Sequence, residues 1–233
     1  MSRFSLDELR REGVDTSRVL IYENARPHHS TILVEARGGT RTILSFAEGV
    51  TPFPMARITP QVLAGARVVF LDHSTRAAAI AKTASWLGIP VVADIERAVP
   101  GMEDWIAQVS HLIVGEKFAR EWTEQHDVEQ AVRELGATRA VAVVTRGERG
   151  CIACGRALKM QVLRVPAYKV DAVDTTGCGD VFHGAYAAEL ARGSDVVTRL
   201  KVASAVAAIK AGHRGGRGGL PSREEALRFM ERG

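Results

Sequence analysis

The fold class is decided by one stretch, which begins Ala66-Arg-Val-Val-Phe-Leu71 and ends Pro90-Val-Val-Ala-Asp94. Both of these segments are short, apolar and rich in valine, which is typical of buried strands. Between them, residues Thr75–Leu87 have the spacing of a helix, and Gly88 ends it. A strand, a helix and a second strand in this order form a βαβ unit, so we expect two parallel strands here.

The alternation of strands and helices continues toward the C-terminus. Further strands are expected at His111–Val114 and Ala140–Thr145, each preceded by a helical pattern. Strands that alternate with helices predict a mostly parallel sheet that helices cover on both faces. Two short strands then follow in hairpin order, near Cys151–Cys154 and Leu158–Val162. The other expected helices lie at Met102–Val109, Glu116–Gln125, Val128–Leu135, Gly179–Arg192, Asp195–Ala211 and Ser222–Arg232.

The N-terminal part of the chain has a different pattern. A short amphipathic helix is expected over Ser5–Glu12, and a strand over Val19–Tyr22. Two more strands, Thr31–Glu35 and Thr40–Phe46, are joined by the turn sequence Ala36-Arg-Gly-Gly39. Two short strands around such a turn predict a β-hairpin.

The composition is that of an ordinary globular protein. Of the 233 residues, 46% are hydrophobic and 25% are charged, and the formal net charge is +4. The apolar content is too high, and the charges are too mixed, for a chain that is mainly disordered. The longest apolar run, Val202–Ile209, is far shorter than the roughly 18 residues of a membrane span, so no membrane partner is expected. The mild positive charge fits an anion-binding enzyme and a nucleic-acid binder equally well.

Three cysteines are too few, and odd in number, for a disulfide scaffold; they are Cys151, Cys154 and Cys178. Their number favours a reducing compartment. Several charged residues among the first twenty predict that no signal peptide begins here, so we expect a cytoplasmic protein. Cys151 and Cys154 form half of a zinc-ribbon pattern, but no second pair follows at suitable spacing. Strand packing is therefore favoured over a metal or redox role.

The stretch Asp174-Thr-Thr-Gly-Cys-Gly-Asp180 precedes a long helix of small and apolar residues. Its glycines let the backbone turn sharply, so that several N–H groups can converge on one anion, and the helix N-terminus adds unsatisfied donors. Asp180 falls on the first turn, where a carboxylate can accept a proton from a substrate hydroxyl. A simple N-cap is the alternative for Asp180. His183, one turn later, is expected to pack rather than to orient the acceptor.

This stretch resembles the C-terminal signature of the ribokinase-like, or PfkB, carbohydrate kinases, whose usual form is D-T-x-G-A-G-D. Cys178 stands where Ala is common, which exchanges one small residue for another. Three further segments are similar to the family, and together the matches cover nearly the whole chain. They are Gly13-Val-Asp-Thr-Ser17, Val143-Val-Thr-Arg-Gly-Glu-Arg-Gly150 and Gly215-Gly-Arg-Gly-Gly-Leu-Pro221.

The resemblance implies a single ribokinase-like kinase domain over residues 1–233. The implied fold is α/β, a three-layer sandwich with a mostly parallel central sheet and a partial β lid. The lid hairpin would occupy about residues 18–46, and the part that binds nucleotide and phosphate about residues 140–233.

The implied activity is phosphoryl transfer from ATP, assisted by Mg²⁺, to a hydroxyl of a sugar or sugar-like small molecule. Asp180 matches the catalytic base of the family. Asp174 and Thr176 match positions that hold a monovalent cation, K⁺ in several members. The anion hole is matched by three residues, Gly177, Cys178 and Gly179. The residues that match the nucleotide site are Thr145, Gly147, Gly150 and Gly215.

Two further candidates have open alternatives. The family's N-x-x-E segment, which organises magnesium and phosphate, is replaced by Val114-Gly-Glu-Lys-Phe118. Glu116 is the candidate there, acting on the metal through water, and an exposed acid that stabilises a helix start is an equal alternative. Arg41 and Arg37 on the expected hairpin could face the substrate, although arginines on a β-ribbon are usually solvated.

The family builds its acceptor site from an N-terminal segment with a first strand, an Asp and a G-G-x-x-x-N helix. Nothing similar occurs before Gly13, so we expect the chain to start inside the family's fold and to lack that substrate-binding segment. A catalytically impaired homologue that binds nucleotide or sugar is the first alternative. RNA binding through Arg214-Gly-Gly-Arg-Gly-Gly219 is a minor one, because a single copy without interleaved aromatics predicts no nucleic-acid partner. Lid strands that pair between subunits are compatible with a homodimer.

Overall fold

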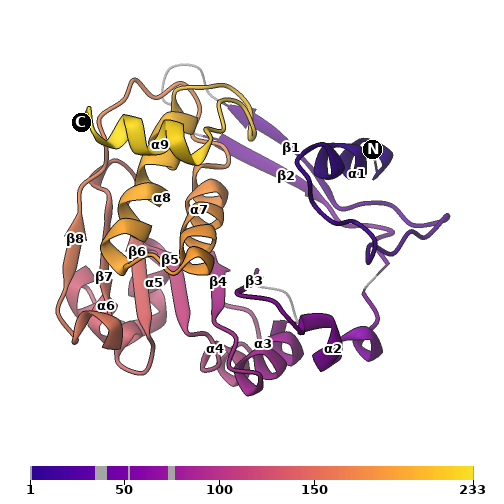
Figure 1. Cartoon of the computed structure of the whole chain (residues 1–233), viewed down its shortest axis with the longest axis horizontal. Helices are drawn as coiled ribbons and strands as arrows, with labels where there is room; N and C mark the ends of the chain where they lie inside the picture. The colour runs from indigo at the N-terminus through magenta and orange to yellow at the C-terminus, as the bar shows by residue number, and fades with distance from the viewer. Residues whose placement is uncertain (1, 35–40, 52, 73–76, 233) are drawn as a thin grey trace. The chain divides into compact units, whose positions relative to one another are not determined.

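The computed structural model describes residues 2–34, 41–51, 53–72 and 77–232 of the chain (Figure 1). Contacts within the chain divide it into two compact units, residues 1–55 and residues 56–233. The larger unit carries the central sheet and the motif at residues 174–180, so it positions the candidate site.

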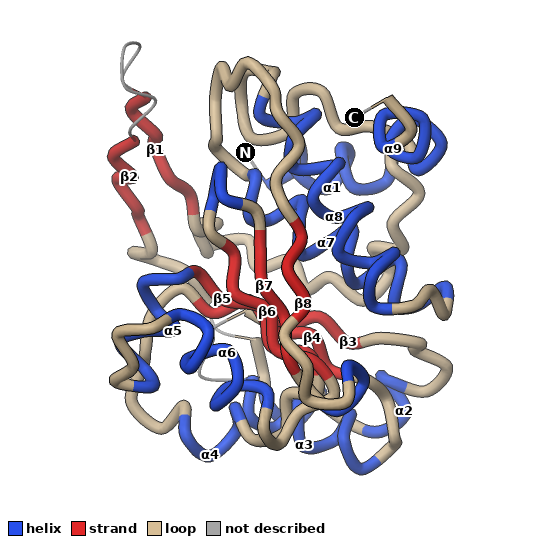
Figure 2. The backbone as a smooth tube through the Cα atoms, turned by 90° about the vertical axis from the view of Figure 1, so that its left-hand side faces the viewer, coloured by secondary structure: helices blue, strands red, loops and turns tan. Residues whose placement is uncertain are grey.

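The larger unit is built on a six-stranded sheet (Figure 2), whose strands lie side by side in the order of the sequence, as Figure 1 shows. The strands from β3 to β6 are parallel, and β7 and β8 complete the sheet in antiparallel orientation. The expected mostly parallel sheet is therefore confirmed. The strands are β3 (Val69–Leu71), β4 (Val91–Ile95), β5 (His111–Gly115), β6 (Val141–Thr145), β7 (Cys151–Cys154) and β8 (Leu163–Val165).

The last strand lies later than the sequence pattern predicts. A strand at Leu158–Val162 is wrong, because β8 begins at Leu163. Residues Arg156–Leu158 form a 3₁₀ turn instead, and Lys159 and Met160 follow it with φ of 51° and 60°. Extended backbone has negative φ, so these two residues delay the strand.

Helices cover both faces of the sheet (Figure 1). One face packs against α3 (Ala77–Trp86), α4 (Glu103–Ile106), α5 (Glu116–Thr123) and α6 (Val128–Gly136). The other face packs against α7 (Cys178–Arg192) and α8 (Val196–Ala211), and α9 (Arg223–Met230) packs on α8. This is the three-layer α/β architecture that the sequence predicts.

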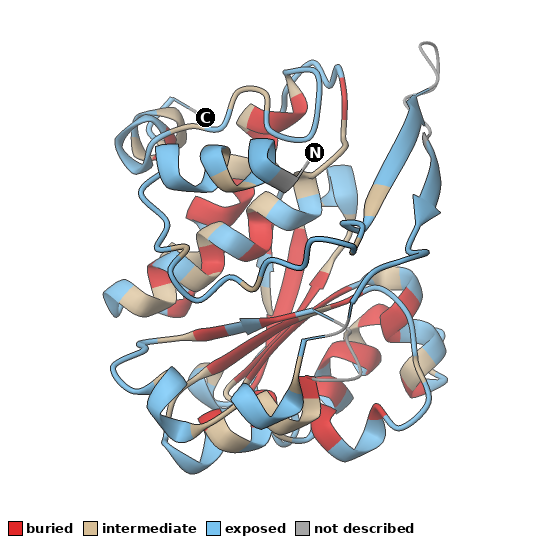
Figure 3. Cartoon of the chain, turned by 90° about the vertical axis from the view of Figure 1, so that its right-hand side faces the viewer, coloured by how far each residue is buried: buried red, intermediate tan, exposed pale blue. Residues whose placement is uncertain are grey.

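Successive residues of each strand face opposite layers, which is why the strands are mostly apolar. In β4, Val91 and Ala93 join the core beside α3–α6, whereas Val92 joins the core beside α7 and α8. In β5, Leu112 and Ile113 divide in the same way. Buried residues accordingly run along the strands and the helix sides that face them (Figure 3). Burying one such side chain contributes ~1.5–3 kcal/mol, so the two cores hold the layers together.

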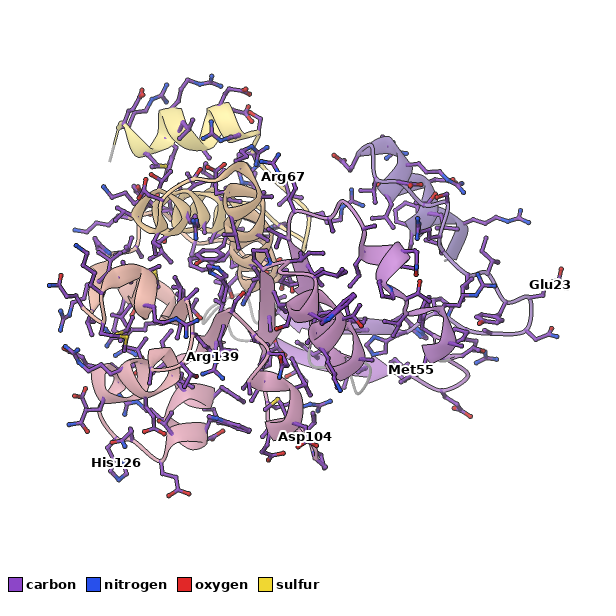
Figure 4. All side chains as sticks on the ribbon, turned by 60° about the horizontal axis from the view of Figure 1, so that its bottom comes forward. Glu23, Met55, Arg67, Asp104, His126 and Arg139 are labelled. Carbon is purple, nitrogen blue, oxygen red and sulfur yellow. The ribbon has the colours of Figure 1, made fainter. Side chains whose placement is uncertain are left out.

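Most charged side chains lie outside these cores (Figure 4). Asp104 and His126 are exposed, whereas Arg139 is buried. Arg139 donates to the carbonyl oxygens of Leu135 at 2.6 Å and of Ile106 at 3.1 Å, and burial lowers its pKa. These hydrogen bonds link the end of α6 to α4.

Of the helices in the described ranges, none is long and apolar enough to cross a membrane.

The smaller unit contains a helix and a two-stranded sheet. The helix is α1 (Ser2–Arg11), and β1 (His29–Val34) pairs with β2 (Arg41–Phe46) in antiparallel orientation. The predicted helix and hairpin are therefore confirmed. Apolar side chains of the hairpin, such as Leu33 and Ile43, are more than half exposed.

The predicted strand at Val19–Tyr22 is wrong. Hydrogen bonds within turns shape this segment. The N–H of Val19 donates to the carbonyl of Thr16 at 3.1 Å, and the N–H of Ala25 donates to the carbonyl of Tyr22 at 3.3 Å. The apolar alternation of this segment therefore marks a turn-rich connection and not a third strand.

Candidate active site

The first turn of α7 lies beside the carboxyl ends of β4 and β5. His183, which is only 4% exposed, makes this connection. Its Nε2 atom lies 3.3 Å from the carbonyl oxygen of Ile113 in β5 and 3.3 Å from Oδ1 of Asp94 in β4. Its Nδ1 atom lies 2.6 Å from the carbonyl oxygen of Gly179. The motif is therefore held at the sheet edge where open α/β proteins bind their ligands.

The two glycines of the motif have different surroundings. Gly177 is the N-cap of α7 and has φ of 79°, a left-handed conformation that favours glycine. A β-carbon on Gly177 would lie 2.7 Å from the carbonyl oxygen of Gly216, so the loop after α8 leaves no room for a side chain. A β-carbon on Gly179 would meet no atom within 4 Å. The space around Gly179 is therefore open to a ligand.

The N–H groups at the start of α7 are largely available. Within the described residues, the N–H groups of Gly179 and Asp180 have no acceptor, as is usual in the first turn of a helix. The Cys178 N–H donates to the carbonyl of Thr175 at 3.2 Å, and its Sγ donates to the carbonyl of Ala207 at 3.6 Å. Free N–H groups at the positive end of a helix can bind an anion.

Asp180 is the third residue of α7, and it is exposed. Its carboxylate forms no hydrogen bond or ion pair with any other described residue. The helix dipole favours a negative charge at this position. The Asp180 carboxylate therefore lies beside the open N–H groups of the same helix turn.

Asp174 ties the motif to the loop after α8. Its Oδ1 accepts the N–H of Thr176 at 2.8 Å, and its Oδ2 accepts the N–H of Gly215 at 2.8 Å. Its own N–H donates to the carbonyl of Ala211 at 3.1 Å. The hydrogen bond from the Thr176 N–H, together with that from Gly215, lowers the pKa of Asp174 to about 2. Asp174 is therefore ionised at neutral pH and joins the two loops.

The predicted monovalent cation site, at Asp174 and Thr176, has two opposing features. The Oγ1 atom of Thr176 is buried and has no hydrogen-bond partner in the described part of the chain. It lies near enough to Asp174 to lower that pKa without reaching hydrogen-bond geometry. The Nζ atom of Lys210, however, lies 2.8 Å from the carbonyl oxygen of Asp174. An unpartnered hydroxyl favours a bound cation, whereas an ammonium group at the same loop disfavours one.

Three of the predicted nucleotide residues, Thr145, Gly147 and Gly150, lie at the turn between β6 and β7, whereas Gly215 lies in the loop after α8. The hydroxyl of Thr145 donates to the carbonyl of Val114 at 3.3 Å, which places Thr145 at the same end of β5 as the start of α7. Gly147 has φ of 57°, and a β-carbon there would meet no atom within 4 Å, so it is open to a ligand. Gly150 has a packing role, because a β-carbon there would collide with the carbonyl oxygen of Val165 in β8.

Glu116 begins α5, and three arginines surround its carboxylate. Oε1 accepts from Arg120 at 2.7 Å, and Oε2 accepts from Arg146 at 3.1 Å and from Arg149 at 2.6 Å. Burial alone would raise the pKa of Glu116, but the hydrogen bonds from Arg146 and Arg120 and the charge of Arg149 lower it. These guanidinium groups bind the same Glu116 carboxylate oxygens that a magnesium ion would need. Among the described residues, no group of three or more metal-ligating side chains is found.

One residue of the predicted site belongs to the smaller unit, and two residues that contact the motif or its helix were not predicted. Arg41 begins β2 in the smaller unit, and its side chain lies outside the described part of the chain, as does all of Arg37. The substrate role of Arg41 stays a prediction. Sequence reasoning missed Lys210 and Asp94. A lysine inside the apolar run of α8 was the available signal for Lys210, whereas nothing local marks Asp94.

Comparison with known proteins agrees with this fold and motif. The model of the pfkB family carbohydrate kinases matches residues 1–223. The ribokinase of Schizosaccharomyces pombe is 27% identical over 230 residues, which span 93% of this chain and 72% of that protein. Alignments with further curated relatives span less than half of the length of those proteins.

Solved structures of ribokinase-like proteins have a fold similar to that of this chain. A candidate ribokinase from Agrobacterium tumefaciens has a TM-score of 0.84 and 29% identity, over 97% of this chain and 75% of that chain. A candidate ribokinase II from E. coli, solved in complex with ATP and Mg²⁺, has a TM-score of 0.85 and 19% identity, over 99% of this chain and 79% of that chain.

The fold, with a helix start at the carboxyl edge of the sheet, defines a ribokinase-like α/β protein. The chain belongs to the pfkB family of carbohydrate kinases. The resemblance drawn from its four motifs is thus confirmed, and the chain is a kinase by its family.

Proposed function

We propose that this chain transfers the γ-phosphoryl group of ATP to a hydroxyl of a sugar or sugar-like small molecule. The observation that carries the proposal is the start of α7, where the open N–H groups of Gly179 and Asp180 adjoin the exposed Asp180 carboxylate. Such an arrangement suits phosphoryl transfer, because the N–H groups hold the phosphate while the carboxylate takes the proton. The ribokinases among its relatives support a sugar-like acceptor.

Asp180 is the general base in this proposal. Its carboxylate accepts the proton of the acceptor hydroxyl while the hydroxyl oxygen attacks the γ-phosphorus. The bond from the γ-phosphorus to the bridging oxygen breaks, and ADP leaves with that electron pair. The proton remains on Asp180 until it is released to water.

The anion hole is proposed at Gly177, Cys178 and Gly179. The N–H groups of Gly179 and Asp180 are open in the free protein, whereas that of Cys178 is partly used by the carbonyl of Thr175. These donors would stabilise the charge on the transferring phosphoryl oxygens.

The nucleotide is proposed to lie between Thr145, Gly147 and the loop at Gly215, with Gly150 shaping the turn. The hairpin of β1 and β2 is proposed as the lid over the acceptor, with Arg41 facing the acceptor. Open space at Gly147 supports the first assignment. The lid assignment rests on the family resemblance.

Magnesium, when bound, would neutralise charge on the phosphates of ATP. The residues around Glu116 do not form a preformed site for it, because arginines occupy both carboxylate oxygens. We infer that the phosphates and water supply most of the magnesium ligands, as is common for this ion. An indirect contact from Glu116 through water stays a prediction.

A second candidate function is binding of nucleotide or sugar without turnover. The arginines that pair with Glu116 favour this second function, since the acid that would organise the metal is already paired.

We also propose a homodimer through the hairpin, which the exposed Leu33 and Ile43 support. A cytoplasmic location is supported by three cysteines that form no disulfide.

The test compares wild type with Asp180→Asn in an assay of ADP release over a panel of sugars and nucleosides. The variant should lose about 10²–10⁴-fold in kcat, because the base is removed. Its melting temperature should still rise with ATP as in wild type. Asp171→Asn, an exposed residue ahead of the motif, is the matched control.

Wild-type activity in Asp180→Asn would contradict the role of Asp180. A wild type whose melting temperature rises with ATP, but which releases no ADP with any acceptor, would favour the impaired binder.

A further inference from the structure

Lys210 is a lysine without exposed surface. It lies on α8 among small and apolar residues, and it is 0% exposed. Its Nζ donates to the carbonyl oxygen of Asp174 at 2.8 Å and to that of His213 at 3.1 Å. Asp174 opens the motif before α7, and His213 opens the Gly-rich loop after α8. One ammonium group thus joins the two loops that meet at the candidate anion site.

The surroundings of Lys210 are built for a positive charge. Removing an ammonium group from water is costly unless the protein replaces its hydration. Two carbonyl oxygens do so here, and the carboxylate of Asp174 supplies the opposite charge. The positive charge of Lys210 adds to the lowering of the Asp174 pKa by the neighbouring N–H groups.

A monovalent cation and an ammonium group need the same kind of surroundings. Each carries one positive charge, and each binds carbonyl and carboxylate oxygens. Each carboxylate oxygen of Asp174 already accepts one N–H group, from Thr176 and from Gly215, so fewer of its lone pairs remain for a second cation. A cation that shared the Asp174 carbonyl with Lys210 would also be repelled by it.

We propose that Lys210 is a tethered cation that replaces the monovalent cation in bracing the anion site. Its effect on catalysis rests on the proposed function, whereas its effect on cation binding does not. Lys210 touches no reacting atom and acts through Asp174, so it is a positioning residue. Phosphoryl transfer by this chain should therefore not require K⁺.

The first test uses wild-type protein and does not depend on the folding of a variant. Rates of ADP release in KCl, NaCl and tetramethylammonium chloride at equal ionic strength should agree. The melting temperature should likewise show no rise that is specific to K⁺. Specific activation by K⁺, or a K⁺-specific rise in melting temperature, would overturn the proposal. The melting measurement needs no acceptor, so it tests Lys210 even if the proposed kinase activity fails.

The second test uses Lys210→Met, which removes the ammonium group and keeps an apolar side chain of similar length. Its kcat should fall about tenfold or more, because the anion site loses its brace. K⁺ or NH₄⁺ should restore part of the rate and raise the melting temperature, whereas tetramethylammonium should not. Lys201→Met, on the exposed side of the same helix, is the matched control and should behave as wild type.

A Lys210→Met protein that folds but gains nothing from K⁺ or NH₄⁺ would show a merely structural lysine and would overturn the proposal. If this variant does not fold, the wild-type comparison of cations still decides.

Discussion

A β-carbon on Gly177 would lie 2.7 Å from the carbonyl oxygen of Gly216. The two residues belong to the loops before α7 and after α8, so these loops meet without room for a side chain. A β-carbon on Gly179, two residues later, would meet no atom within 4 Å. Packing of the two loops therefore requires a glycine at position 177, whereas the space beside Gly179 is open to the proposed phosphoryl group.

Alanine substitutions should separate these two roles. Gly177→Ala should destabilise the protein, because alanine in the left-handed region costs about 1–2 kcal/mol and the clash with Gly216 adds to that. Gly179→Ala should unfold at the same urea concentration as wild type or higher, since alanine suits a first helical turn. Its kcat should nevertheless fall, because the methyl group enters the space proposed for the phosphoryl group.

Urea unfolding and steady-state rates of both variants check this prediction. Full activity in Gly179→Ala, or an equal loss of stability in both variants, would show that the open space at Gly179 is not the anion site.

His183→Ala should lower kcat much more than it changes KM. The imidazole holds the carbonyl of Gly179 and reaches Ile113 and Asp94, so its loss releases the first turn of α7. A displacement of about 1 Å at a reacting centre can cost about 100-fold in rate. His183→Asn, which can still donate to the Gly179 carbonyl, should keep an intermediate rate. A change confined to KM in steady-state kinetics would instead place His183 in acceptor binding.

The order of strands and helices could be predicted because it depends on local periodicity. Continuous apolar residues, such as Val91–Ala93 of β4, become buried on both faces of the sheet. The boundaries of strands and helices depend on the backbone conformation of single residues, which the pattern of apolar residues does not predict. Lys159 and Met160 adopt positive φ after a 3₁₀ turn, and β8 therefore begins beyond the predicted segment.

The site could be predicted only where its residues are contiguous. The motif from Asp174 to Asp180 carries its glycines, its helix start and its carboxylate within seven positions. Lys210 reaches Asp174 from 36 positions away, and periodicity says only that a residue is buried, not which carbonyl it meets. Likewise, the need for glycine at Gly150 comes from the backbone of Val165 in another strand.

Acid should weaken the fold through His111. This residue is buried, and its Nδ1 lies 2.9 Å from the hydroxyl of Tyr186. Burial, helped by the charge of Arg199, lowers the pKa of His111 from 6.5 to about 4. The unfolded chain therefore takes up this proton at higher pH than the folded protein. The contribution of neutral His111 to the free energy of unfolding is fully present above pH 6.5. It is lost as the pH falls toward 4, and the loss is about 3 kcal/mol at most.

Urea unfolding at a series of pH values checks this prediction. His111→Gln should show a flatter dependence of the free energy of unfolding between pH 6.5 and pH 4. His126→Gln, at an exposed position, is the control and should follow wild type. An unchanged slope in His111→Gln would assign the acid sensitivity to other groups.

Glu189 joins α7 to the start of α9, although it is only 1% exposed. Its Oε1 accepts from Nε of Arg223 at 2.7 Å, and its Oε2 accepts from Nη2 of Arg223 at 3.2 Å and from the hydroxyl of Ser194 at 2.6 Å. The hydrogen bonds from Arg223 lower the pKa of Glu189, so the carboxylate is charged at neutral pH. Arg192 reaches the same carboxylate at 3.5 Å from a half-exposed position.

Glu189→Gln should reduce the free energy of unfolding by about 1–3 kcal/mol, because an amide cannot accept at both positions. Arg192→Gln should change it by less than about 1 kcal/mol, since an exposed partner contributes little. Glu189→Gln should also raise KM for ATP, because α9 follows the Gly-rich loop proposed to lie near the nucleotide. Urea unfolding and steady-state kinetics measure both effects. Equal losses in the two variants would mean that the buried pair with Arg223 does not hold α9 in place.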